Sequence, residues 1–155
     1  MIVYRIARKK YARDISGLGA KKVGGRWNFP GMALLYTSGS ISLAMLEVAV
    51  HLPLEKIPSG FYLIKIKVPD SHLIVKPDMN KLPLNWALSV HAPYSQKLGD
   101  DFVNDGKYLV LKVPSAVVPD EFNYLINPEH EDFGKVKILE VKELNFDKRL
   151  FKDEN

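Results

Sequence analysis

The sequence of 155 residues has the length of one domain, and its 46% apolar and 26% charged residues are ordinary for a soluble globular protein. It contains no cysteine, which excludes disulfides, thiolate metal sites and a cysteine nucleophile. The net charge of +4 is unevenly spread, because residues 1–30 carry +7 and residues 31–155 carry −3. Such a basic segment attracts a polyanion, a phosphate-bearing small molecule or an acidic partner, or it is simply a solvated face.

The chain has no apolar run of membrane-spanning length, and its N-terminus begins like a strand and not like a signal peptide. We therefore expect a cytoplasmic protein without a membrane contact. We also expect a single domain over residues 1–155, with the charged residues from about 148 onward frayed.

Short segments rich in aliphatic and aromatic residues predict the strands. In chain order they are Ile2–Ile6, Ala33–Thr37, Phe61–Val68, Tyr108–Val113, Tyr124–Asn127 and Val136–Val141. The third segment alternates best. It places Ile64, Ile66 and Val68 on one side and Lys65 and Lys67 on the other.

Helical spacing of apolar residues predicts the helices. The clearest helix covers Ile41–Leu52, where Ser40 can cap the start and Pro53 ends it. A short helix is expected around Leu84–Val90 and a longer one over Tyr94–Asn104. Because these helices do not alternate regularly with the strands, the pattern favours an α+β fold.

Glu47 stands out inside the first predicted helix as the only acid between Asp14 and Glu55. An ionised carboxylate among apolar residues is costly unless it is paired or left open to a cleft. Two interpretations follow. Glu47 forms an ion pair with a basic residue or with His51, or it lines a pocket and stabilises a cation.

A glycine-rich loop precedes the second predicted strand and closes with a Pro-Gly pair typical of a type II turn. It carries Arg26, Trp27 and Asn28, which offer an anion-binding guanidinium, a stacking surface and an amide. Those groups suit a nucleotide. The alternative is a plain turn in which Trp27 fills the core.

Ser115 follows a predicted strand and lies between two prolines, without the glycines of a hydrolase nucleophile elbow. It is either a hydrogen-bond donor to a ligand or a turn serine. The four histidines lack the spacing of a metal site, so no metal is expected.

Taken together, these segments resemble the RES domain, which is named for an Arg, a Glu and a Ser and is the toxin half of a bacterial toxin–antitoxin pair. The resemblance runs through nearly the whole chain, and the loop Gly24–Asn28 is its most specific part. The other matching segments are Val3–Ile6, Ser16-Gly17, Leu35–Ser38, Leu43–Glu47 with His51, Val113–Val118, and Asn123–Pro128 with His130.

The resemblance implies an ADP-ribosyltransferase-like fold, with a split, mostly antiparallel β-sheet flanked by helices. It also implies a toxin that consumes NAD as its substrate by breaking the bond between nicotinamide and ribose. Hydrolysis, phosphorolysis and transfer of ADP-ribose to a protein target are all compatible with the resemblance. No metal is implied.

The resemblance further implies the residues of the site. Arg26, Tyr36 and Glu47 would be catalytic, and the NAD-binding residues would be Arg26, Tyr36, Ser115, Ser38 and Arg5. Arg26 would grip the diphosphate, and Tyr36 would stack on nicotinamide or present its hydroxyl. Ser115 would hydrogen-bond the nicotinamide amide or a ribose hydroxyl, and Glu47 would stabilise the positive charge that develops on the ribose.

The resemblance also implies a partner, which is an Xre-type helix-turn-helix antitoxin. The pair would bind DNA only through this antitoxin.

A different class of function stays open at this point. A nucleic-acid-binding module would use the basic residues Arg8, Lys9, Lys10 and Arg13, with steep salt dependence.

Overall fold

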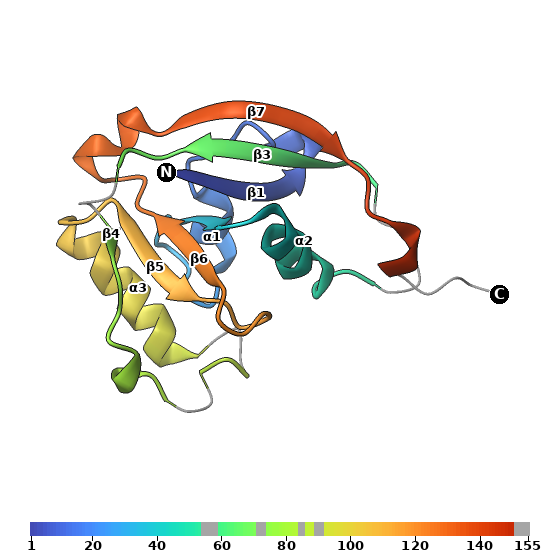
Figure 1. The fold of residues 1–155 in the computed structure, drawn as a ribbon. Coiled ribbons are helices and arrows are strands. Elements are labelled where there is room, and N and C mark those ends of the chain that lie inside the picture. Colours follow the sequence, from blue (N-terminus) through green and yellow to red (C-terminus); the bar gives the residue numbers. More distant parts are fainter. Residues whose placement is uncertain (54–58, 71–73, 84–85, 89–91, 151–155) are drawn as a thin grey trace.

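The structure is a computed structural model that describes residues 1–53, 59–70, 74–83, 86–88 and 92–150. Within these residues, seven strands form one sheet in the order β4-β5-β6-β2-β1-β3-β7 (Figure 1). The strands are β1 Ile2–Arg8, β2 Leu35–Ser38, β3 Phe61–Lys67, β4 Ile74–Val75, β5 Val110–Pro114, β6 Phe122–Ile126 and β7 Lys137–Leu144. The α-helices are α1 Leu18–Val23, α2 Ile41–Ala49 and α3 Pro93–Asp105. Short 3-10 turns cover Lys9–Tyr11, Met79–Lys81, Glu131–Lys135 and Lys148–Leu150.

The sheet is split near its middle. β1 and β2 are paired in register only at Tyr4 and Ser38, whereas β1 pairs with β3 along its whole length. The described strand pairs are antiparallel except β4 with β5, which are parallel. The expected α+β fold with a split, mostly antiparallel sheet is therefore confirmed.

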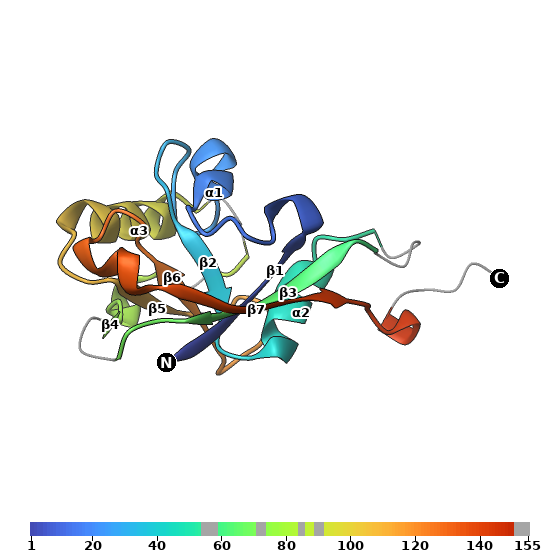
Figure 2. The same cartoon turned by 90° about the horizontal axis from the view of Figure 1, so that it is seen from above.

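Three apolar clusters stabilise the two halves of the sheet. One cluster draws on both halves, with Val3, Leu35 and Ile126 among its buried members. The other two belong to one half each, because α3 packs on β5 and β6 while α2 packs on β1 and β3. Figure 2 shows these two helices well apart, with α3 at the left and α2 to the right of the middle.

The predicted strands and the two longer helices are confirmed, with boundaries that differ by up to three residues. The cap of α2 is confirmed as well, since Ser40 Oγ accepts a hydrogen bond from the Leu43 N–H at 3.1 Å. α2 ends at Ala49, and a further turn of backbone hydrogen bonds continues to Leu52, just before Pro53.

Besides the 3-10 turns, one described helix and one described strand were not predicted, and two predictions extend beyond the described residues. α1 has six residues and β4 has two, which is too short for a periodic signal. Of the short helix expected around Leu84–Val90, residues 86–88 form a turn, and the rest lies outside the described residues. In the expected frayed end, Lys148–Leu150 form a 3-10 turn, and residues 151–155 lie outside the described part.

The alternation of β3 is confirmed for its inner face, where Ile64 and Ile66 are fully buried. Phe61 and Leu63, on the side of the lysines, are buried too. Their burial has a physical cause, because α2 covers the first half of that face through Ala44. No helix among the described residues is long and apolar enough to cross a membrane.

Candidate functional site

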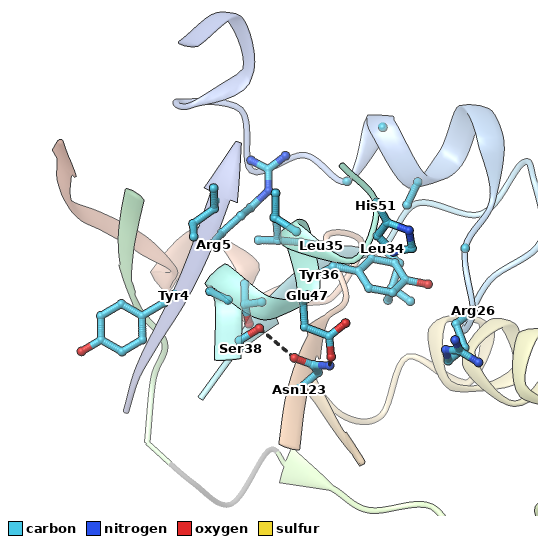
Figure 3. Close-up of a pocket in the computed structure, with 18 of the residues that line it drawn as sticks. Tyr4, Arg5, Arg26, Leu34, Leu35, Tyr36, Ser38, Glu47, His51 and Asn123 are labelled. Carbon is cyan, nitrogen blue, oxygen red and sulfur yellow. Dashed lines mark hydrogen bonds between the residues drawn. The ribbon is translucent and has the colours of Figure 1, made fainter. Parts of the chain in front are cut away.

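A cavity of about 470 Å³ lies where the two halves of the sheet meet. Its walls come from β1, α1, β2, α2, β6 and the loop of residues 24–31, which carries Arg26 and is called the arginine-bearing loop below (Figure 3). The cavity brings together five of the six predicted site residues, which are Arg5, Arg26, Tyr36, Ser38 and Glu47. The sixth, Ser115, reaches the site through Glu47.

Glu47 lies half-buried on α2 and is held by two uncharged donors. Its Oε1 accepts a hydrogen bond from Ser115 Oγ at 2.8 Å and another from Asn123 Nδ2 at 2.5 Å. Glu47 also lines the cavity. Of the two interpretations of this lone acid, the geometry therefore favours the pocket carboxylate.

The hydroxyl of Ser115 is used within the protein. Ser115 directly follows β5, and its Oγ accepts from the N–H groups of Val117 and Val118, each at 3.0 Å. Its single proton goes to Glu47. Because a serine hydroxyl has one proton and two lone pairs, Ser115 has no proton left to donate to a ligand. We interpret it as an anchor of Glu47.

Asn123 was not predicted as a site residue. It pairs in register with Ser38 across β2 and β6, and Ser38 Oγ donates to Asn123 Oδ1 at 2.7 Å. Asn123 in turn donates to Glu47, which is 76 positions away in the sequence. In the sequence, Asn123 is marked only by its place in the segment Asn123–Pro128, which resembles the family. No local pattern shows that it faces the Glu47 carboxylate.

The three side chains offered by the arginine-bearing loop divide between the cavity and the core. Trp27 is 2% exposed, and its ring centroid lies 5.6 Å from that of Trp86, so of the two alternatives for this loop the structure favours, for this side chain, the one in which it fills the core. Asn28 is fully buried. Arg26 lines the cavity, and its Nη1 donates to the Trp86 carbonyl at 2.9 Å. Burial lowers the pKa of Arg26, while the Glu47 charge raises it.

The hydroxyl of Tyr36 holds this loop in place. It accepts from the Trp27 N–H at 3.0 Å and donates to Asn28 Oδ1 at 2.8 Å. Burial raises the pKa of Tyr36 well above its ordinary value, so the phenol stays protonated. A Cβ at Gly25 would lie 2.6 Å from this hydroxyl, which explains a glycine there. The hydroxyl is thus engaged inside the protein, and the ring forms part of the cavity wall.

α3 supports the loop from the other side. Gln96 Nε2 donates to the carbonyls of Gly25 and Asn28, and Ser95 Oγ donates to the carbonyl of Arg26. The periodicity of the sequence predicted α3 itself. It did not reveal that this buried polar face supports the arginine.

Arg5 lies near one end of the cavity and fixes the chain that follows β1. Its Nη1 donates to the carbonyls of Asp14 and Tyr11, at 2.7 and 3.2 Å. Burial lowers the pKa of Arg5, against the opposing effect of the Asp14 charge. A direct contact of Arg5 with NAD stays a prediction.

Within the described residues, no group of three or more His, Cys, Asp or Glu side chains lies close enough to hold a metal ion. His51 lines the cavity, and His130 is buried, where its Nδ1 accepts from the Asp132 N–H at 3.0 Å.

Comparison with known proteins places the chain in a family. The sequence matches the RES domain over residues 2–148. It is 39% identical over 155 residues to Toxin Res of Photorhabdus laumondii, with 98% of each chain covered. It is 38% identical over 150 residues to the Prs ADP-ribosylating toxin of a Sphingobium species, covering 94% of this chain and 92% of that protein.

A solved structure agrees with the fold. A chain of the Mycobacterium tuberculosis MbcT–MbcA toxin–antitoxin complex superposes with a TM-score of 0.73 at 20% identity, covering 93% of this chain and 84% of that one.

Because the RES domain model matches residues 2–148, this protein belongs to the RES domain family. Within that family it is a RES-domain toxin of a toxin–antitoxin system, as the resemblance implied.

The support of the loop by α3 gives a first prediction. A Cβ at Gly99 would lie 1.6 Å from the Trp27 carbonyl oxygen, so Gly99→Ala must displace α3 or the loop. We expect a loss of about 1–3 kcal/mol of stability, as for other overpacked cores, and a melting temperature several degrees lower.

Gly134→Ala is the matched control, because a Cβ at Gly134 meets no heavy atom within 4 Å. Both melting temperatures are measured by calorimetry. Equal stability of the two variants would contradict the close packing of α3 against the loop.

Proposed function

We propose that this toxin degrades NAD by cleaving the bond between nicotinamide and ribose. The observation that carries the proposal is the Glu47 carboxylate, which lines a cavity of about 470 Å³ together with Arg26 and is anchored by uncharged donors. A volume of this size lies within the range of small-molecule and cofactor sites. The side chains present fit a ligand that carries phosphates at one end and develops positive charge at another.

Glu47 supplies the electrostatic part of the reaction. When the C–N bond breaks, nicotinamide leaves with the electron pair and the ribose takes on oxocarbenium character, as in other glycosidic cleavages. A fixed negative charge beside the ribose stabilises that state more than the ground state. An oxygen of water or of phosphate then forms the new bond to the ribose carbon.

Arg26 and Tyr36 bind and orient the substrate. A guanidinium is a planar fork that binds phosphate oxygens at two points, and Arg26 lines the cavity with Glu47. Tyr36 offers the face of its ring to nicotinamide, because its hydroxyl is engaged with the loop. Arg5 and Ser38 line the same cavity and complete the proposed binding site.

The first experiment identifies the products by mass after the purified protein is incubated with NAD, with and without phosphate. Free ADP-ribose shows hydrolysis, and ADP-ribose 1″-phosphate shows phosphorolysis. Glu47→Gln should fold normally and lose most of the cleavage, at least about a hundredfold, because removal of one electrostatic group of this kind costs that much. Cleavage at the wild-type rate by Glu47→Gln would reject the assignment.

The role of Arg26 gives a further prediction. Arg26→Ala should weaken NAD binding markedly, and Arg26→Lys should restore only part of the affinity, because lysine lacks the planar fork. Calorimetric titration with NAD measures the affinity. A lower melting temperature with unchanged NAD affinity would show instead that Arg26 only holds the site together, for example through the charge of Glu47.

Transfer of ADP-ribose to a protein is the second candidate. One observation favours it, namely the 38% identity to a relative described as a Prs ADP-ribosylating toxin. This function uses the same cleavage of NAD and differs only in the acceptor. The product analysis distinguishes it, since an added target protein would gain the mass of ADP-ribose.

A nucleic-acid-binding module is not favoured. Of the four basic residues that this alternative needs, Arg8 is used within the fold, where it donates to the Ser59 carbonyl and lies 4.1 Å from the Phe61 ring centroid. The family assignment instead supports the NAD-consuming toxin.

We further propose that a cognate antitoxin binds at the mouth of the cavity. An Xre-type helix-turn-helix protein encoded beside this gene would restrain the toxin in the cytoplasm and would carry the DNA binding of the pair. The structural neighbour is itself part of a toxin–antitoxin complex. Lys21 and Lys22 are exposed on α1, and Val23 is 71% exposed and lines the cavity. An acidic or carboxylate-ended segment would be attracted there and would block NAD access.

Co-expression with the neighbouring gene tests the partner. The pair should co-purify, and NAD cleavage should fall in proportion to the complex formed. Reversing the charge of Lys21 and Lys22 to glutamate should slow association and reduce its salt dependence. If the neighbour neither binds nor inhibits, the antitoxin proposal fails, while the NAD chemistry is judged separately from the products.

A further inference from the structure

We propose that Asn123 is a positioning residue that fixes the orientation of the Glu47 carboxylate, so that one of its oxygens faces the substrate. The inference rests on the proposed function for its kinetic consequence. Its structural basis is two successive hydrogen bonds, from Ser38 to Asn123 and from Asn123 to Glu47. Figure 3 shows these three side chains at the wall of the cavity.

The two oxygens of the Glu47 carboxylate differ in their surroundings. Oε1 accepts two hydrogen bonds, from Ser115 and from Asn123. A carboxylate oxygen has two strong acceptor positions in its plane, so Oε1 is saturated. Among the described residues, no donor is bound to Oε2. Because Glu47 lines the cavity, this leaves Oε2 as the oxygen available to a ligand there.

Ser38 sets the orientation of the Asn123 amide. An amide can present either its oxygen or its nitrogen to a neighbour, and the two orientations have nearly the same shape. The hydroxyl of Ser38 donates to Oδ1 at 2.7 Å, which leaves Nδ2 on the side of Glu47. The reverse orientation would place Oδ1 against the carboxylate and repel it.

The backbone under Asn123 is held on both sides. β6 is an inner strand, and Asn123 is in register with Ser38 on β2 and with Val113 on β5. The donor is therefore carried by the sheet itself and not by a loop. A catalytic group held in this way needs little reorganisation when charge develops beside it.

Asn123 and Ser115 share a further property, which is that neither carries a charge. A lysine or arginine in the same position would hold the carboxylate equally well but would cancel much of its field at the ribose. An amide and a hydroxyl anchor Oε1 without neutralising the carboxylate, which keeps its net negative charge. The positioning role thus explains why uncharged residues occupy this site.

The kinetic test compares two variants of Asn123 at pH 8, with NAD cleavage as the readout. Asn123→Ala should lower kcat about ten- to hundredfold with little change in KM, because a hydrogen bond to a charged group is lost. Asn123→Asp should lose more, although aspartate is closer in shape. A second carboxylate at this distance either repels Glu47 or forces a proton onto the pair. Asn104→Asp, at an exposed position of α3, is the control for the added charge.

The order of the two variants decides between positioning and mere packing. If Asn123 only fills space, Asn123→Asp should be tolerated better than Asn123→Ala. That order, or an unchanged kcat in both variants, would overturn the proposal. Ser38→Ala should give a smaller loss than Asn123→Ala, because it frees the amide to turn without removing it.

A second measurement does not depend on NAD cleavage. In the NMR spectrum of the wild-type protein, a side-chain amide proton of Asn123 should resonate downfield as the donor of a charge-assisted hydrogen bond. It should move upfield in Glu47→Gln and be affected in Ser38→Ala. An unshifted resonance would reject the positioning role alone. If the resonance shifts but wild-type protein does not cleave NAD, the proposed function fails and the contact stands.

Discussion

The Glu47 carboxylate joins the two halves of the split sheet. Its helix, α2, packs on β1 and β3, whereas Ser115 and Asn123, the donors that hold its Oε1, come from the end of β5 and from β6. The backbone itself connects the halves weakly, since β1 and β2 are paired in register only at Tyr4 and Ser38. The proposed catalytic group is therefore also a structural link across the cavity that it lines.

The part of the cavity wall that carries Arg26 is held in a different way. Arg26 is held through its backbone, because Tyr36, Ser95 and Gln96 bind the peptide groups of its loop. Its guanidinium is held separately, by the hydrogen bond from Nη1 to the Trp86 carbonyl. The side chain of Glu47, in contrast, is held through one of its own carboxylate oxygens, Oε1. The contacts around Arg26 fix the position of a loop, whereas those of Glu47 fix the orientation of a single side chain.

Much of the fold could be predicted from the sequence, because the strands are marked by short apolar runs and α2 by its serine cap and following proline. Glu47 stood out by being the only acid in an apolar helix. The roles of the individual site residues could be predicted less well. Nothing local to Ser115 shows that its proton goes to Glu47, and Asn123 acquires its role through strand register with Ser38. Such contacts join residues far apart in the chain, so only the folded structure shows them.

The anchors of this site have a consequence for how the protein can be controlled. An amide and a serine hydroxyl hold Glu47, and the Tyr36 phenol that holds the arginine-bearing loop has its pKa raised by burial. None of these groups gains or loses a proton in the range where cells operate. A change of pH within that range therefore does not alter the charge of these anchors. A molecule that fills or covers the cavity would therefore switch off such a protein without disturbing the groups that hold the site together.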